Sequence, residues 1–328
     1  MYSSPCLRVF ASAALTIGLA ATPCESIAQT WPDRPIRIIV PYSAGGYADF
    51  MTRTVGQKLS ETFKQPVIVE NRPGANSITG VSAVARADPD GYTFGTVIAA
   101  HAVNPSLNPT LPFDVTRDFT YISLMSIAPL MLVVRKSLPV SNVEQLISLA
   151  KVKPGTLNYG SSGIGAGAHL TMELLMKRTG VKMTHVTYKG GADALRDLVA
   201  EQLDLEFDVV GNLVGQVQAG TIKAIAVSSK KRITALPTVP TMEEEGFPDF
   251  VSGTWAGIIA PTGVSHDIIN RLSLEIDRIV KETSVSTLLE SRGYEPAGGS
   301  AADFGRFFRV EVERWADVIK SSNIKIER

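Results

Sequence analysis

Two loops rich in glycine and serine hold the residues whose types and spacing could do chemistry. One covers residues 41–49 (PYSAGGYAD) and the other residues 160–169 (GSSGIGAGAH). Each loop follows a strand-like run and precedes a segment with helical periodicity, so free backbone N–H groups and the positive end of a helix dipole would meet there. Glycines allow a close approach of the backbone, and serine hydroxyls add donors. The two loops therefore predict a site that holds an anionic oxygen, such as a carboxylate, without a basic side chain.

Most candidate ligand-binding residues belong to these loops. They are Tyr42, Ser43, Ala44, Gly45, Gly46, Tyr47 and Asp49 in the first loop, and Ser161, Ser162, Ile164, Gly165 and Ala166 in the second. The alternative is a purely structural role, in which the glycines only make tight turns and Asp49 caps a helix starting at Phe50. The number of glycines favours binding, because a single tight turn needs fewer of them.

Three further candidates lie outside the loops. His101 follows a run of small residues at the end of an expected strand, and Trp255 is an aromatic residue near the expected cleft. Asp208 shares a strand face with Asp204, which permits an acid/base pair, although turn capping also explains Asp204. Core packing is the alternative for each aromatic residue.

The sequence offers little support for catalysis or a cofactor. The second loop resembles a dinucleotide-binding fingerprint but lacks its third glycine, and no glycine loop is followed by Gly-Lys-Ser/Thr. A serine hydrolase remains the alternative from another class, using a loop serine with His169 and with His185 nearby, although the GxSxG spacing is absent. The four histidines show no metal-ligand spacing. We expect no metal and no cofactor.

The N-terminus has the pattern of a secretory signal. An apolar run at residues 9–21 is followed by Ser26-Ile27-Ala28, so we expect cleavage near Ala28 and an exported product. Both cysteines, Cys6 and Cys24, would leave with the leader, which excludes a thiol nucleophile and a disulfide framework. Lys and Arg number 32 and Asp and Glu also 32, a balance that argues against nucleic acid as a partner.

The elements that must position the loops follow an alternating pattern. Strands are expected at residues 36–40 and 66–70 with a helix at 51–63 between them, a βαβ unit with parallel strands. A second α/β unit is expected at 157–188, a capping box at Ser141 and Glu144, and a long amphipathic helix at 304–319. The apolar segments 127–134 and 253–258 are expected to cross between two domains, which makes the first domain discontinuous.

The assembled motifs resemble the Bug family, also called TctC, the extracytoplasmic solute-binding receptors of tripartite tricarboxylate transporters. The resemblance rests on WPDRPIR at residues 31–37, the first loop, VENRPG at 69–74, PDGY at 89–92, NPSL at 104–107, YKG at 188–190 and LPTVP at 236–240. It implies a periplasmic binding protein of type II, a Venus flytrap with two α/β domains joined by crossover strands. The expected divisions are a signal peptide at 1–28, domain 1 at 29–129 plus 252–328, and domain 2 at 130–251.

The resemblance also implies a function. Such a receptor captures a small carboxylate between its domains, as a monomer, and delivers it to membrane permease subunits without chemistry. In the family the two loops hold the ligand carboxylate by backbone groups. The chain departs from the family in both loops. The first loop has Tyr47 where Gly or Pro is usual, and the second has Ile164 and Ala166 to Ala168 where polar residues are common. Both departures favour an aromatic or apolar carboxylate. An orphan receptor that signals to a sensor kinase is a further alternative.

Overall fold

Strands and helices alternate along the chain, and the strands join into one mixed sheet. The computed structural model describes residues 1–2, 31–188 and 190–322. The predicted leader therefore lies outside the described residues, apart from its first two.

Ten strands make up the sheet in the described part of the chain. They are β1 (Ile36–Val40), β2 (Val67–Asn71), β3 (Thr93–Ile98), β4 (Phe119–Arg135), β5 (Asn158–Ser161), β6 (Thr184–Thr187), β7 (Leu205–Val209), β8 (Ile222–Val227), β9 (Gly253–Pro261) and β10 (Glu295–Gly298). Their order is β2-β1-β3-β9-β4-β7-β5-β6, and β8 and β10 also pair with β4.

Helices connect most of these strands. They are α1 (Tyr47–Phe63), α2 (Ile78–Ala85), α3 (Ala100–Leu107), α4 (Val143–Val152), α5 (Gly167–Thr179), α6 (Gly191–Val199), α7 (Val210–Gln218), α8 (His266–Lys281), α9 (Thr283–Ser291) and α10 (Ala301–Ser322). Among the described residues, no helix combines the length and the apolar character needed to cross a membrane.

Both expected α/β units are confirmed. Strand β1 pairs in parallel with β2 across α1, and β5 pairs in parallel with β6 across α5. The apolar face of α1 is buried as its periodicity predicts, with Met51, Val55 and Leu59 almost fully enclosed. The strand–helix order thus brings the starts of α1 and α5 to the carboxyl ends of parallel strands.

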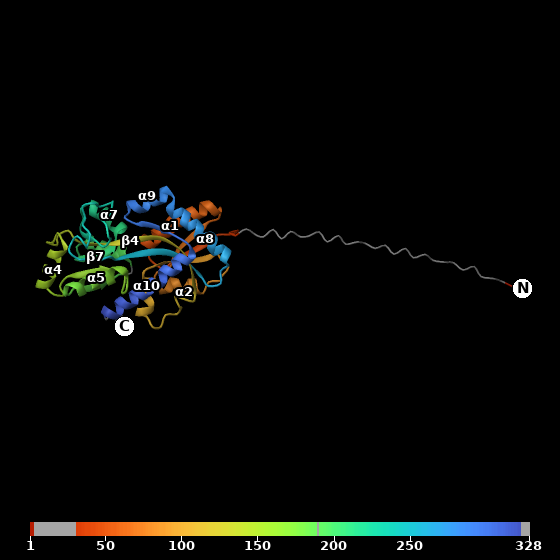
Figure 1. Cartoon of the computed structure of the whole chain (residues 1–328), viewed down its shortest axis with the longest axis horizontal. Helices are drawn as coiled ribbons and strands as arrows, with labels where there is room; N and C mark the ends of the chain where they lie inside the picture. The colour runs from red at the N-terminus through yellow and green to blue at the C-terminus, as the bar shows by residue number, and fades with distance from the viewer. Residues whose placement is uncertain (3–30, 189, 323–328) are drawn as a thin grey trace. The chain divides into compact units, whose positions relative to one another are not determined.

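The long strand β4 changes partners near its middle. Its first part pairs antiparallel with β9, ending at Pro129 with Gly253, and its second part pairs with β7 from Leu130 with Val209. In Figure 1, β4 runs along the middle, with α1 and α8 toward one end and α4, α5 and α7 toward the other. The two expected crossover segments lie in β4 and β9, whereas their crossing between two domains and the division into those domains stay predictions.

Helix α10 closes one part of the core. Phe304, Phe308, Trp315 and Ile319 are buried on one side of the helix, which confirms the predicted amphipathic pattern. The ring of Phe308 stacks on Tyr121 of β4, with 4.2 Å between ring centroids. The chain end is therefore packed against the strand that joins the two parts of the sheet.

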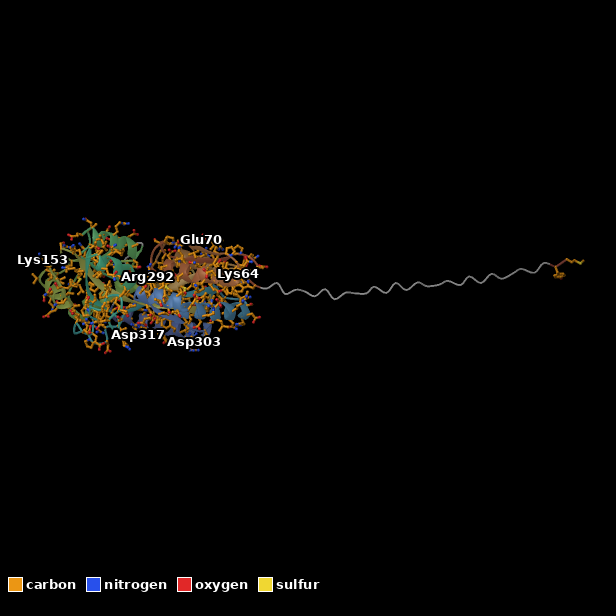
Figure 2. The ribbon with its side chains drawn as sticks, turned by 90° about the horizontal axis from the view of Figure 1, so that it is seen from above. Lys64, Glu70, Lys153, Arg292, Asp303 and Asp317 are labelled. Atoms are coloured by element: carbon orange, nitrogen blue, oxygen red, sulfur yellow. The ribbon has the colours of Figure 1, made fainter. Side chains whose placement is uncertain are left out.

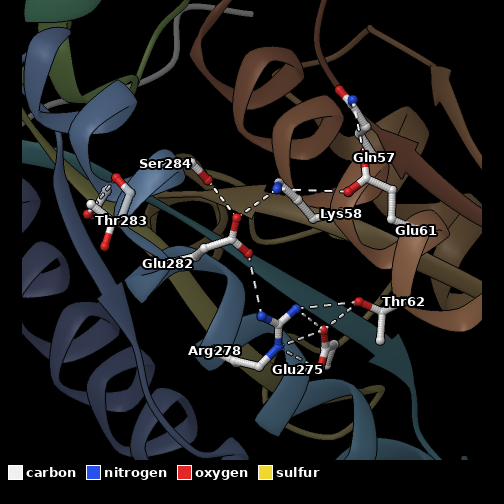
Figure 3. A network of polar contacts seen from close by, with 10 residues as sticks. Gln57, Lys58, Glu61, Thr62, Glu275, Arg278, Glu282, Thr283 and Ser284 are labelled. Atoms are coloured by element: carbon white, nitrogen blue, oxygen red, sulfur yellow. Dashed lines mark hydrogen bonds and ion pairs between the residues drawn. The ribbon is translucent and has the colours of Figure 1, made fainter.

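Charges of both signs are interspersed on the surface. Figure 2 shows Lys64, Glu70 and Lys153 among the outer side chains. Figure 3 shows a network between α1 and the α8–α9 junction, in which Lys58 Nζ lies 2.7 Å from Glu282 Oε1. Thr62 Oγ1 in the same network donates to Glu275 Oε1 at 2.8 Å. The Lys58–Glu282 pair is half-buried, and the network links α1 to α8 and to the α8–α9 junction.

The predicted capping box is wrong by one residue. Helix α4 is capped by Asn142, whose Oδ1 accepts a hydrogen bond from the Gln145 backbone N–H at 2.8 Å. The side chain of Gln145 in turn caps the preceding residue. Its Oε1 accepts a hydrogen bond from the Ser141 backbone N–H at 2.8 Å. An amide pair replaces the expected serine and glutamate because asparagine caps a helix as well as serine does.

We expect Asn142→Ala to lower the free energy of unfolding by about 1 kcal/mol, because the first-turn N–H of α4 loses its acceptor. Ser141→Ala is the matched control and should change it by less than about 0.5 kcal/mol. Urea unfolding of the three proteins measures both values. An equal effect of the two substitutions would contradict this assignment of the cap.

Candidate functional site

A small cavity lies where several helices begin. Its volume is about 70 Å³. Its lining residues are Tyr42, Ser43, Ala44, Gly46, Tyr47, Ala48, Ile98, Leu130, Ser162, Ala166, Gly167, Ala168, Gly190, Gly191, Ala192, Asp208, Val209, Asn212 and Thr254. The amino ends of α1, α5, α6 and α7 all contribute to this lining.

The electrostatics of the cavity follow from these four helix starts. The first N–H groups of a helix have no partner within the helix, and the helix dipole places partial positive charge there. Among the described residues that line the cavity, none is a lysine or arginine, and Asp208 is the one charged side chain. The cavity can therefore hold a small anion by backbone groups alone.

The first loop is fixed by a side chain in the first turn of α1. Gly46 is the N-cap, and Gly45 has a φ of +86°, a left-handed conformation that glycine adopts without strain. The Gly45 N–H donates to Asp49 Oδ2 at 2.9 Å. Burial by itself would raise the pKa of Asp49, but hydrogen bonds from Arg53, Gly45 and Asn71 outweigh it and lower the pKa below its usual value. Asp49 is thus a charged support of the loop.

The second loop uses the same arrangement with another side chain. Ala166 is the N-cap of α5, and Gly165 has a φ of +79°. The Gly165 N–H donates to His169 Nδ1 at 3.1 Å. In both loops, the side chain of the third helical residue therefore accepts a hydrogen bond from the backbone N–H of the glycine just before the N-cap.

His169 can accept this bond because it is neutral. Burial, with the neighbouring His185 as a smaller cause, lowers the pKa of His169 to about 3, and burial lowers that of His185 to about 4. The two imidazole rings stack with 4.2 Å between centroids. His185 Nε2 lies 2.7 Å from Ser161 Oγ, which in turn donates to the Gly163 carbonyl at 3.0 Å. The histidine pair therefore holds the second loop from behind.

Comparison with known proteins decides what kind of site this is. Residues 51–324 match the model of the tripartite tricarboxylate transporter family receptor. Protein BugT of Bordetella pertussis is 32% identical over 322 residues, which cover 98% of this chain and 99% of BugT. This chain belongs to the tripartite tricarboxylate transporter receptor family. The resemblance seen in the sequence is thereby confirmed.

Solved structures confirm the fold. Rpa4515 of R. palustris, described with adipate, is 35% identical with a TM-score of 0.88 and covers 90% of this chain and 99% of its own. MatC from Rhodopseudomonas palustris, described with bound malate, is 29% identical with a TM-score of 0.83 and covers 88% of this chain and 100% of its own. The receptor has the mixed α/β fold of periplasmic binding proteins, and its family consists of solute-binding receptors rather than enzymes.

The hydrolase alternative fails because the family consists of solute-binding receptors, and the geometry of Ser161 does not support it either. Ser161 pairs with His185 and not with His169, whose Nδ1 already accepts the Gly165 N–H. Ser161 is only 2% exposed and does not line the cavity. A buried hydroxyl of this kind supports the loop and has no access to a substrate in the cavity.

The structure brings together eight of the predicted site residues. Those that line the cavity are Tyr42, Ser43, Ala44, Gly46, Tyr47, Ser162, Ala166 and Asp208. Tyr47 is one of them, and its hydroxyl is hydrogen-bonded to Ser126 of β4 at 2.8 Å. Five other predicted residues belong to the two loops but do not line the cavity: Gly45, Asp49, Ser161, Ile164 and Gly165. The expectation of a helix starting at Phe50 is wrong, since α1 begins at Tyr47.

The remaining two predicted residues lie away from the cavity. His101 is fully buried among aromatic rings, with Phe119 and Phe308 each 5.3 Å away between centroids, and burial lowers its pKa to about 3. Trp255 is 2% exposed, donates through Nε1 to Glu311 and borders a separate groove of about 650 Å³. Alternation along β9 explains this, because its neighbour Thr254 is the residue that reaches the cavity.

Sequence reasoning missed a third and a fourth helix start. Gly190 is the N-cap of α6 and Gly191 its first residue, and Val209 and Asn212 belong to the β7–α7 junction. The glycine pair after β6 repeats the strand–glycine–helix pattern of the first two loops, and that pattern was the available signal. The other missed lining residues are Ala48, Ile98, Leu130, Gly167, Ala168, Ala192 and Thr254.

A second carboxyl group lies behind the cavity. Glu206, two residues before Asp208 on the same strand face, is 1% exposed, and its two carboxyl oxygens have no hydrogen-bond partner. Burial, with the nearby Asp208 as a smaller cause, raises the pKa of Glu206 well above its usual value. No group of three His, Cys, Asp or Glu in the described part of the chain could hold a metal ion.

We expect Glu206→Leu to stabilise the receptor, and to do so more at pH 8 than at pH 5. The unfolded chain releases this proton near pH 4.3 whereas the folded chain retains it, so the wild-type free energy of unfolding falls by about 1.4 kcal/mol per pH unit above that point until the folded pKa is reached. The leucine variant lacks this loss.

Urea unfolding at both pH values measures the effect, with Glu243→Leu on the exposed surface as the control. A variant that is no more stable than the wild type, or a gain that is equal at pH 5 and pH 8, would contradict the assignment of a buried, protonated Glu206.

Proposed function

We propose that the receptor binds a small apolar or aromatic carboxylate in this cavity, with the carboxylate at the amino ends of α1 and α5. The observation that carries the proposal is the convergence of four helix starts on a cavity with no basic side chain among its described lining residues. Backbone N–H groups at helix starts bind carboxylates without a counter-charge from a side chain.

The walls of the cavity support an apolar ligand body. They consist largely of hydrocarbon, contributed by Ala44, Ala48, Ile98, Leu130, Ala166, Ala168, Ala192 and Val209, with the ring of Tyr47. Relatives support the carboxylate, since Rpa4515 is described with adipate and MatC with malate. A few polar groups on an apolar surface are the usual composition of a small-molecule site.

The size of the cavity supports a receptor that opens and closes. A volume of about 70 Å³ is the space that roughly two water molecules take up in the liquid, so the walls would separate to admit most organic acids. The partner change in β4 at residues 129–130 and the β9 strand beside it would be the hinge between the predicted domains, 29–129 plus 252–328 and 130–251. The closed form would deliver the ligand to the transporter's permease in the membrane from the periplasm, because only contacts specific to that form can report occupancy.

Calorimetric titration of the purified receptor tests the ligand class. We expect saturable one-to-one binding with members of a panel of benzoate, nicotinate and ring-substituted benzoates that carry one carboxylate, and weaker binding of citrate, glutamate and aspartate. Tight binding of citrate alone would overturn the apolar class, and binding of no carboxylate would overturn the proposed site.

His169→Phe tests whether the second loop must be held for binding. Phenylalanine preserves the ring stack on His185 but removes the acceptor of the Gly165 N–H, so the dissociation constant for the best panel member should rise about tenfold. His101→Phe is the matched control, because His101 is also a buried neutral histidine but lies away from the cavity. Equal affinities of the His169 variant and the wild type would contradict the loop's role.

A further inference from the structure

One charged side chain reaches the cavity from β7. Asp208 is 7% exposed, and its Oδ2 accepts a hydrogen bond from Asn212 Nδ2 at 2.9 Å. Its carboxyl group also lies against the first residue of α6, because a Cβ placed on Gly191 would be 2.6 Å from Oδ2. Asp208 is thus held at the amino ends of two helices, α6 and α7.

This placement makes the cavity asymmetric. A carboxylate near a helix start complements the partial positive charge there, so the starts of α6 and α7 already face an anion supplied by the protein. Asp49 lies in the first turn of α1 but accepts the Gly45 N–H and does not line the cavity, and α5 has no acidic residue in its first turn. No carboxylate of the described lining therefore lies at the starts of α1 and α5. One end of the cavity therefore accepts an anion, and the other end presents one.

The Asp208 end of the cavity also favours ligand groups that donate hydrogen bonds. An ionised carboxylate only accepts hydrogen bonds, and its two oxygens together offer about four lone-pair positions. Asn212 uses one of them and the Val209 backbone N–H a second. A ligand group beside Asp208 is favoured when it donates a hydrogen bond and disfavoured when it carries a negative charge.

We propose that Asp208 determines the class of ligand: an acid with one carboxylate at the α1 and α5 end and a hydrogen-bond donor, a hydroxyl or an ammonium group, at the Asp208 end. This inference rests on the proposed function and adds the identity of the ligand's second end. It makes Asp208 a specificity-determining residue that discriminates against acids carrying a second carboxylate.

The surroundings of Asp208 determine how this selectivity varies with pH. Glu206 faces it from β7 and Tyr294 from the segment before β10, whereas α6 and α7 present the uncharged Gly191 and Asn212. Burial raises the pKa of Asp208 to about 6, against hydrogen bonds from Asn212 and the Val209 backbone that lower it. Asp208 is therefore mostly ionised at pH 7.5 and mostly protonated at pH 5, where the discrimination against diacids should weaken.

Two matched series of acids test the proposal by calorimetry on the full-length mature receptor at pH 7.5. One series is benzoate, 4-hydroxybenzoate, 4-(aminomethyl)benzoate and terephthalate, and the other is hexanoate, 6-hydroxyhexanoate, 6-aminohexanoate and adipate. Within a series the carboxylate and body are constant and only the second end changes. The two donor-bearing members also separate a hydroxyl from an ammonium group.

In the series that fits, we expect the wild type to bind a donor-bearing acid at least about tenfold more tightly than the diacid and the unsubstituted acid. Asp208→Asn should improve diacid binding at least about tenfold, because it removes the negative charge that repels the second carboxylate. It should weaken binding of the ammonium-bearing acid, because the same charge attracts the ammonium group. Asp193→Asn is the matched control, since it removes one charge from the first turn of α6 at a side chain that is 38% exposed and outside the cavity.

Three results would overturn the inference while leaving the carboxylate site intact. In the first, the wild type binds the diacid as tightly as the donor-bearing acids. In the second, it binds the unsubstituted acid as tightly as the donor-bearing acids. In the third, Asp208→Asn keeps the wild-type preference for donor-bearing acids over the diacid. The wild-type comparisons decide the matter even if the Asp208 variant fails to fold. If neither series and no other carboxylate binds, the proposed function fails first and the inference fails with it.

Discussion

Four helices that begin at one cavity impose the constraint on which the rest of the structure depends. Each of these helices follows a strand of the sheet, so β1, β5, β6 and β7 all end toward the same small space. The N–H groups at the helix starts make that space suitable for an anion, and a basic side chain is not needed. Near-zero net charge is consistent with this mode of binding, because the attraction is local and comes from the backbone.

Binding by backbone groups requires loops that keep their shape, and the chain meets this need twice in the same way. Asp49 and His169 occupy equivalent positions in α1 and α5, and each accepts from the glycine before the N-cap. One acceptor is an ionised carboxylate and the other a neutral imidazole, so the geometry is repeated although the chemistry differs. Strand β4 connects the two loops, because it is bonded to Tyr47 through Ser126 and carries Leu130 to the cavity wall.

The sequence predicted features that depend on local pattern and missed those that depend on exact position or on tertiary packing. The β-branched run of β1 and the buried face of α1 follow from periodicity, and the two glycine loops follow from composition. A shift of one residue was enough to name Trp255 instead of Thr254, since neighbours in a strand face opposite sides. The α6 and α7 starts were missed because only the fold brings them to the first two loops. Nothing in the sequence around Glu206 shows that its carboxyl group is buried without a partner.

The central claim is that helix-start backbone groups hold the ligand carboxylate, and a crystal structure with the tightest-binding monocarboxylate tests it most directly. The account predicts carboxylate oxygens within about 3.2 Å of backbone nitrogens at the starts of α1 and α5, with no lysine or arginine side chain in hydrogen-bond contact with them. A carboxylate held by a basic side chain, or a ligand bound in the groove beside Trp255, would contradict it.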